Sequence, residues 1–155
     1  MQKRAFLREV DIFAQLSDGE LDVLCGIAHE FKVPHGTAVF KEKDPTTALF
    51  IVREGSVELV RGEARARIAR IERGQIFGEL ALFEDRPRSS AAISAMAPET
   101  TLYTISKTDL EAAFQAHPVL AAKVLRGVLK RVAQRLRAAD DAIQTLLRSA
   151  VQAWS

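Results

Sequence analysis

The sequence has one cysteine, one tryptophan and one tyrosine among its 155 residues. Because a disulfide needs two cysteines and an iron–sulfur or zinc-finger framework needs several, the lone Cys25 excludes these frameworks within one chain. No apolar run approaches the length of a membrane span. The N-terminal residues, MQKR, lead into an amphipathic pattern rather than into the apolar core of a signal peptide. We therefore expect a cytoplasmic protein with no internal disulfide and no membrane partner.

Groupings typical of enzymes and metal sites are also missing from the sequence. The three histidines, His29, His35 and His117, lie far apart and lack the spacing of metal ligands. We find no Ser–His–Asp grouping, no supported pair of carboxylates and no P-loop. Cys25 falls in a helical pattern, which favours a small buried residue over a nucleophile. We expect no catalytic residue and no metal, so the chain is not predicted to be an enzyme.

What the chain does contain is typical of one globular domain with a sizeable core: 48% of its residues are apolar and 27% are charged. The charge is unevenly distributed. Residues 118–155 hold seven Lys/Arg and two Asp/Glu, whereas the preceding residues hold fifteen and eighteen. A basic tail can indicate nucleic-acid binding, but these basic residues surround an amphipathic helix, which favours a solvated helix face.

The apolar periodicity divides the chain into three segments. Residues 4–31 are predicted to be helical, with a capping box at Ser17–Glu20. Residues 33–106 are predicted to form many short strands separated by Gly and Pro, including a hairpin turn at Arg53–Ser56. Residues 107–155 are again predicted to be helical. This order predicts an α+β, mainly β, fold built on a barrel or sandwich.

One insertion among the strands carries a chemical signature, the segment GQIFGELALFEDRPRSSA at residues 74–91. Gly78 allows the backbone to approach a ligand closely. Residues 79–83 can form a helical turn whose first N–H groups point at an anion. Arg88 offers a two-pronged, permanently charged donor to phosphate oxygens. The segment therefore predicts a pocket for one phosphate and one sugar, in which Glu79 accepts from a ribose hydroxyl and Ser89 adds a hydroxyl donor.

The letters FGELAL at 77–82 followed by RPRSSA at 86–91 resemble the phosphate-binding cassette of cyclic nucleotide-binding domains. The nine-residue step from Glu79 to Arg88 matches the spacing in protein kinase A regulatory subunits, and the resemblance extends from about residue 12 to about residue 139. It implies a jelly-roll barrel, or double-stranded β-helix, with N-terminal helices and a long C-terminal helix. The expected parts are a cyclic nucleotide-binding β-roll with flanking helices at 1–117 and a lid and dimerisation helix at 118–155.

The resemblance also implies roles for individual residues. Arg88 would bind the cyclic phosphate and Glu79 the ribose 2′-hydroxyl, while the backbone N–H groups of Gly78, Leu80 and Ala81 would assist. The expected ligand is a cyclic nucleotide, and no metal is implied.

Ser89, directly after the arginine, resembles the bacterial catabolite-activator group, which uses cyclic AMP. Members selective for cyclic GMP often carry threonine there. The ligand prediction therefore leans to cyclic AMP, and cyclic GMP stays open.

The chain departs from the family pattern in three places. Lys43 stands where many members have a glycine before Asp–Pro. Ala139–Asp140 aligns with the Thr–Ser pair that touches the adenine in catabolite activators, so that mode of base recognition is not expected. The chain also ends where those activators begin a helix-turn-helix domain. We therefore expect that it is not a complete DNA-binding regulator of that type.

The last segment carries a heptad pattern of apolar residues over about four heptads, which predicts a homodimer through a two-stranded coil. Arg135 and Asp140 would occupy g and e positions and pair across a parallel interface, adding only about 0–1 kcal/mol. A helix packed back on its own barrel is the alternative. The predicted seam residues are Leu125, Leu129, Val132, Leu136, Ala139, Ile143, Leu146 and Ala150.

Three functions remain open from the sequence alone. The first is a cyclic nucleotide sensor that signals through its C-terminal helix to an unknown downstream protein. The second is a degenerate barrel that serves as an interaction or dimerisation module. The third is the sensor half of a transcription regulator separated from its DNA-binding half.

Overall fold

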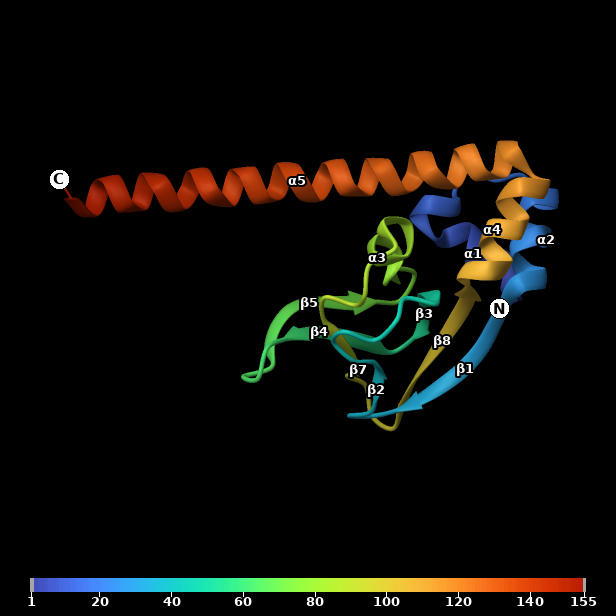
Figure 1. Cartoon of the computed structure of the whole chain (residues 1–155), viewed down its shortest axis with the longest axis horizontal. Coiled ribbons are helices and arrows are strands. Elements are labelled where there is room, and N and C mark those ends of the chain that lie inside the picture. Colours follow the sequence, from blue (N-terminus) through green and yellow to red (C-terminus); the bar gives the residue numbers. More distant parts are fainter. Residues whose placement is uncertain (1, 155) are drawn as a thin grey trace.

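The computed structural model describes residues 2–154, apart from the side chains of three residues in the cassette, Leu80, Ala81 and Leu82. Two antiparallel sheets form a jelly-roll barrel, with helices gathered at one end and one long helix running across the top (Figure 1). None of the helices in the described part of the chain is both long and apolar enough to cross a membrane. The elements are α1 (Lys3–Glu9), η1 (Asp11–Phe13), α2 (Asp18–Ile27), β1 (Ala28–Pro34), β2 (Ala38–Phe40), β3 (Ala48–Glu54), β4 (Ser56–Arg61), β5 (Ala66–Glu72), β6 (Ile76–Phe77), α3 (Glu79–Glu84), β7 (Ala91–Ser94), β8 (Glu99–Ser106), α4 (Lys107–Ala116) and α5 (Pro118–Trp154).

Each sheet has four strands, and every strand pair is antiparallel. The strand order is β1-β8-β3-β6 in the first sheet and β2-β7-β4-β5 in the second. The order departs from the order along the chain, because consecutive strands repeatedly pass from one sheet to the other. This architecture confirms the mainly β jelly-roll fold that the sequence predicts.

The alternation of side chains along β3 explains why the first sheet is apolar on both faces. Leu49 and Ile51 point to a core shared with the helices, whereas Phe50 and Val52 point to the core between the two sheets. The first core also includes the inward side of α5, through Leu120, Val124 and Val128. The barrel is therefore anchored to the helices through the outer face of one sheet.

The N-terminal helical segment is shorter than predicted. The capping box is confirmed, because the Ser17 hydroxyl accepts from the Glu20 N–H and the Glu20 carboxylate accepts from the Ser17 N–H. However, α2 ends at Ile27, and residues 28–31 belong to β1, which pairs with β8 along its whole length. Pairing with a distant strand overrides the local helical pattern there.

The predicted hairpin at Arg53–Ser56 is also wrong. β3 and β4 lie in different sheets and do not pair, so Gly55, with φ of +100°, turns the chain from one sheet to the other. A Cβ at Gly55 would lie 2.8 Å from the Thr100 hydroxyl oxygen, which itself contacts the Ser56 backbone. The tight approach of β8 therefore requires glycine at this crossing.

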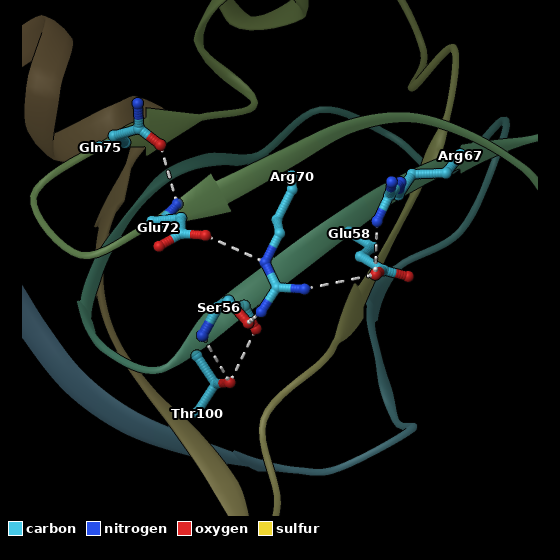
Figure 2. Close-up of polar contacts among 7 residues, drawn as sticks. All are labelled: Ser56, Glu58, Arg67, Arg70, Glu72, Gln75 and Thr100. Atoms are coloured by element: carbon cyan, nitrogen blue, oxygen red, sulfur yellow. Dashed lines mark hydrogen bonds and ion pairs between the residues drawn. The ribbon is translucent and has the colours of Figure 1, made fainter.

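Arginines on the neighbouring hairpin of β4 and β5 are engaged by acidic side chains. Arg70 lies between Glu58 and Glu72 and also reaches the Ser56 hydroxyl, and Arg67 contacts Glu58 from the other side (Figure 2). These contacts hold the two strands together across their exposed face. Arg67 and Arg70 of this hairpin are thus paired with acidic side chains of the same two strands.

The long helix α5 has two parts that differ in their contacts. Its first turns pack on η1, where Gly127 approaches so closely that a Cβ would lie 2.8 Å from the Ile12 Cα. Lys123 also forms an ion pair with Glu20 of α2, at 2.6 Å. From residue 134 to residue 154 every side chain is exposed, and the helix extends past the barrel (Figure 1).

Candidate functional site

The candidate site forms around a turn that links β6 to α3. Gly78 has φ of +78°, a left-handed conformation that favours glycine, and it directly precedes the first helical residue, Glu79. A Cβ on Gly78 would lie 2.5 Å from the Nη1 atom of Arg88. Glycine therefore allows the backbone of the turn to lie against the arginine side chain.

Arg88 is fixed by backbone carbonyls and aromatic rings. Its Nη1 donates to the Gly78 carbonyl at 2.6 Å, and its Nη2 donates to the Ala48 carbonyl. The guanidinium carbon lies 4.2 Å from the Phe40 ring centroid and 5.8 Å from that of Phe50, which are cation–π distances. The side chain is thus held in one orientation by contacts from β2, β3 and the Gly78 turn.

The charge of Arg88 is buried and incompletely satisfied. The residue is 4% exposed, and its Nε atom has no hydrogen-bond partner among the described atoms. Burial lowers the pKa of Arg88, while the charges of Glu79 and Asp44 oppose that shift. A buried donor without an acceptor is costly, so the site favours an anion that supplies one.

Glu79 begins α3 and faces the long helix. It is 3% exposed, and its Oε1 lies 3.7 Å from Arg131 Nε and 3.6 Å from Arg135 Nη1. Arg131 also donates to the Ile76 carbonyl at 3.0 Å, and burial lowers its pKa. Arg131 therefore bridges the two sides of the Gly78 turn, and α5 is joined to the cassette through its arginines.

The predicted site residues fall in different surroundings. Gly78, Glu79 and Arg88 are brought together, whereas Ser89 is exposed, and its carbonyl accepts from Arg61 Nε at 3.0 Å. The backbone of Leu80 and Ala81 lies in the first turn of α3, but their side chains lie outside the described atoms.

Two residues from the sequence analysis have defined surroundings in the structure. Arg135 lies beside Glu79 of its own chain, and its pairing with Asp140 of a second copy stays a prediction. Lys43, where many members of the family have glycine, has φ of +68°, the conformation that glycine favours.

Sequence reasoning missed several contributors to the site. Arg131 could have been found from the sequence, because it lies four residues before Arg135 and therefore on the same side of the helix. Phe40 and Phe50 could not, since only the meeting of the two sheets puts their rings beside Arg88. Among the described residues, no cluster of three His, Cys, Asp or Glu side chains is arranged to hold a metal ion.

Comparisons with known proteins point to one family. The sequence model for the cyclic nucleotide-binding domain matches residues 30–117. The N-terminal domain of a transcriptional regulator from Streptomyces coelicolor is 31% identical to the chain and superposes with a TM-score of 0.70, over 88% of this chain and 96% of that one.

Two curated relatives are longer proteins. A cAMP-dependent protein kinase regulatory subunit from Aspergillus niger is 29% identical over 58% of this chain. A cGMP-dependent protein kinase from Toxoplasma gondii is 31% identical over 68% of this chain. The matched regions span 22% of the regulatory subunit and 10% of the kinase, so the similarity concerns one domain of each.

Proposed function

Since the chain belongs to the cyclic nucleotide-binding domain family, we propose that it is a sensor that binds cyclic AMP at the cassette and signals through α5. The observation that carries this proposal is the Nε atom of Arg88, which is buried without an acceptor among the described atoms. The other two nitrogens of that guanidinium are engaged by backbone carbonyls. An oxygen of a cyclic phosphate would accept from the Nε–H group.

Charged side chains surround the proposed site. Glu79 and Asp44 lie near Arg88, and Glu79 and Asp11 lie near Arg131. Arg88 is the cation that the single negative charge of a cyclic phosphodiester would meet in the cassette. In the proposal Arg88 binds the phosphate, the N–H groups of Gly78, Leu80 and Ala81 assist, and Glu79 accepts from the ribose 2′-hydroxyl.

The choice of cyclic AMP rests on two supporting points. Ser89 follows the cassette arginine, as in the catabolite-activator group, and the Aspergillus relative is named for its dependence on cyclic AMP. Cyclic GMP is the competing ligand, because the Toxoplasma relative is named for it. A direct comparison of the two affinities decides between them.

Signalling would pass through the arginines of α5. A ribose hydroxyl that bonds to Glu79 changes the surroundings of the carboxylate that Arg131 and Arg135 now contact. A ligand shifts a helix only by its differential affinity for two arrangements. Because Arg131 also contacts Ile76, movement of the Gly78 turn would be transmitted to α5. The cytoplasm is the location that we propose for such a sensor.

We also propose that two copies associate through α5. Large apolar side chains along this helix are exposed in a single chain, and an identical helix offers the same stripe. The sequence-predicted seam residues Leu125, Leu129, Leu136, Ile143 and Leu146 are all exposed, whereas Val132 is half-buried.

A second candidate is the sensor part of a transcription regulator, which the similarity to the Streptomyces regulator domain favours. The full coding sequence of the gene would test it by revealing whether a DNA-binding domain follows. A degenerate barrel without ligand is the least favoured alternative, because Arg88 contacts Gly78 and Glu79 directly follows that glycine.

Calorimetric titration with cyclic AMP and cyclic GMP tests the proposed function. The unaltered protein is expected to bind both, with cyclic AMP bound more tightly. Arg88→Ala is expected to weaken binding at least about tenfold, since hydrogen bonds to charged groups contribute roughly 1.5–3 kcal/mol.

Arg86→Ala is the matched control, because Arg86 is an exposed arginine two residues before Arg88. It should bind as the unaltered chain does, and thermal unfolding should show that both variants are folded. Absence of heat with either nucleotide at millimolar concentration would refute the sensor proposal.

A further inference from the structure

Four phenylalanine rings, from β1, β2, β3 and β6, form a connected cluster inside the barrel. The ring centroid of Phe77 lies 6.1 Å from that of Phe40 and 5.3 Å from that of Phe50. Phe40 and Phe50 are 5.8 Å apart, and Phe31 meets Phe50 edge-on at 6.0 Å. Because the faces and edges of these rings pack against one another, a cation that contacts one of them meets a well-fixed aromatic surface.

The guanidinium of Arg88 lies over one ring of this cluster. Its central carbon is 4.2 Å from the ring centroid of Phe40, and 5.8 Å from that of Phe50. A ring attracts a cation within about 6 Å of its centroid, and the attraction is stronger when the pair is removed from water. Arg88 is 4% exposed and Phe40 is 9% exposed. The contact with Phe40 is therefore close, desolvated and the stronger of the two.

The two carboxylates near Arg88 are engaged elsewhere. Glu79 and Asp44 are close enough for their charges to raise the pKa of Arg88 against the lowering that burial causes. However, Glu79 is paired with arginines of α5, and the Asp44 carboxylate accepts from the Lys41 N–H at 2.9 Å. Within the described part of the chain, Arg88 forms no ion pair with either of them. The charge of Arg88 is thus met by a neutral ring face and by carbonyl oxygens.

We propose that Phe40 is a positioning residue, whose ring holds the Arg88 guanidinium in place without neutralising it. A carboxylate in the same place would bind the arginine by opposite charge, and an incoming phosphate would have to displace it. A ring face attracts the cation through its quadrupole and leaves the full charge available to an anion. Without the ring, the guanidinium can turn toward Glu79 or Asp44. The inference rests on the proposed function, because it specifies how the same site is prepared for a phosphate.

Fluorinated phenylalanine at position 40 separates the electrostatic effect of the ring from its packing. Fluorine weakens the negative face of the ring and changes its shape little. With one, two and three fluorines on Phe40, the Kd for cyclic AMP is expected to rise stepwise. The rise should reach between about threefold and tenfold with three fluorines, because the desolvated cation–π contact is weakened. Phe40→Leu removes the ring face altogether and should raise the Kd at least as much, with thermal unfolding as the check that each variant is folded.

Phe31 is the matched control for the fluorine series. It belongs to the same ring cluster, but it packs against Phe50, whereas the cation–π contacts of Arg88 are with Phe40 and Phe50. Three fluorines on Phe31 should therefore change the Kd for cyclic AMP by less than about twofold. Equal losses of affinity at positions 31 and 40, or binding that fluorination of Phe40 does not weaken, would overturn the inference.

A measurement on the ligand-free protein keeps this inference distinct from the proposed function. In NMR spectra, the ring current of Phe40 is expected to move the Arg88 Nε–H resonance upfield, and Arg88→Ala identifies that resonance by its absence. Phe40→Leu should return the resonance toward the position of exposed arginines. An Arg88 resonance that is the same in both proteins would overturn the inference, even if cyclic AMP binds. An upfield resonance that Phe40→Leu abolishes, in a protein that binds neither nucleotide, would refute the sensor proposal and still support the role of Phe40 in holding Arg88.

Discussion

The two sides of the cassette are held in different ways. On the barrel side, Arg88 is fixed by two backbone carbonyls and the rings of Phe40 and Phe50. On the helix side, Glu79 meets α5 through ion pairs at 3.6 and 3.7 Å, longer than hydrogen bonds. The barrel side is preorganised, whereas the helix side depends on where α5 lies.

This difference predicts that the affinity for the ligand and the response of α5 to the ligand depend on different residues. A group that is already oriented binds an anion without a further ordering cost, so the barrel side should determine how tightly the ligand binds. A contact that can be exchanged at low cost suits the element that must move, so the helix side should determine what the ligand changes. Variants on each side should therefore alter different measurements.

The largest effect is expected on the barrel side, from Gly78→Ala. The new Cβ would lie 2.5 Å from Arg88 Nη1 and would displace the guanidinium. We expect ligand affinity to fall between about tenfold and a hundredfold, since hydrogen bonds to charged groups contribute roughly 1.5–3 kcal/mol. Calorimetry measures the loss.

Gly74→Ala is the control for backbone strain, because Gly74 has a similar φ of +83° but open space around the added Cβ. It should share the conformational cost and keep the affinity. Equal losses of affinity in the two variants would show that the contact with Arg88 is unimportant.

A smaller effect, of a different kind, is expected on the helix side from Arg131→Gln. Losing the bridge between Glu79 and Ile76 should uncouple α5 from the cassette. In the unaltered protein, the ligand is expected to alter amide hydrogen exchange over residues 118–133. In Arg131→Gln we expect this alteration to be about half as large, because the remaining ion pair of Arg135 is weak.

Arg126→Gln is the matched control, since Arg126 lies on α5 at an exposed position away from the cassette. It should leave the ligand-induced exchange unchanged. If Arg131→Gln behaved like the control, the route from the cassette to α5 would have to pass elsewhere.

The smallest effect is expected where α5 meets α2. Hydrogen bonds from Lys123 and then from the Ser17 N–H lower the pKa of Glu20 from 4.5 to about 2. A lowered carboxyl pKa stabilises the folded state above pH 4.5, and this stabilisation is lost as the pH falls toward 2. Glu20→Gln should therefore lower the Tm slightly at pH 7, and its difference from the unaltered protein should narrow in acid.

Glu63→Gln, at an exposed loop position, should show the same Tm as the unaltered protein across that pH range. A Tm difference for Glu20→Gln that stays constant between pH 7 and pH 3 would contradict the assignment of the pKa.

Local features of this protein could be predicted from its sequence, because they depend on neighbouring residues. The capping box at Ser17–Glu20 and the order of glycine, acid and arginine in the cassette are of this kind. The hairpin at Arg53–Ser56 was predicted wrongly, because the prediction used neighbouring residues alone. Gly55 makes the local turn, but whether the next strand pairs with β3 depends on strands far away in the sequence.

The helix side of the site could not be predicted, because it depends on the rotation of α5 about its own axis. That rotation is set by Leu120, Val124 and Val128 in the core and by the approach of Gly127 to Ile12. Only this packing turns Arg131 and Arg135 toward Glu79. The heptad pattern alone gives no information about this contact within the chain.

The close contact of Gly127 with Ile12 gives the molecule a mechanical property. About 40 Å of uninterrupted helix separates Gly127 from Trp154. A tilt of about 5° around that contact would displace the tip by about 3.5 Å, whereas the turns beside the barrel would move by about 1 Å. If α5 tilts at this contact, a small change of angle beside the cassette would become a several-fold larger displacement at Trp154, large enough to reorganise side-chain packing at that end.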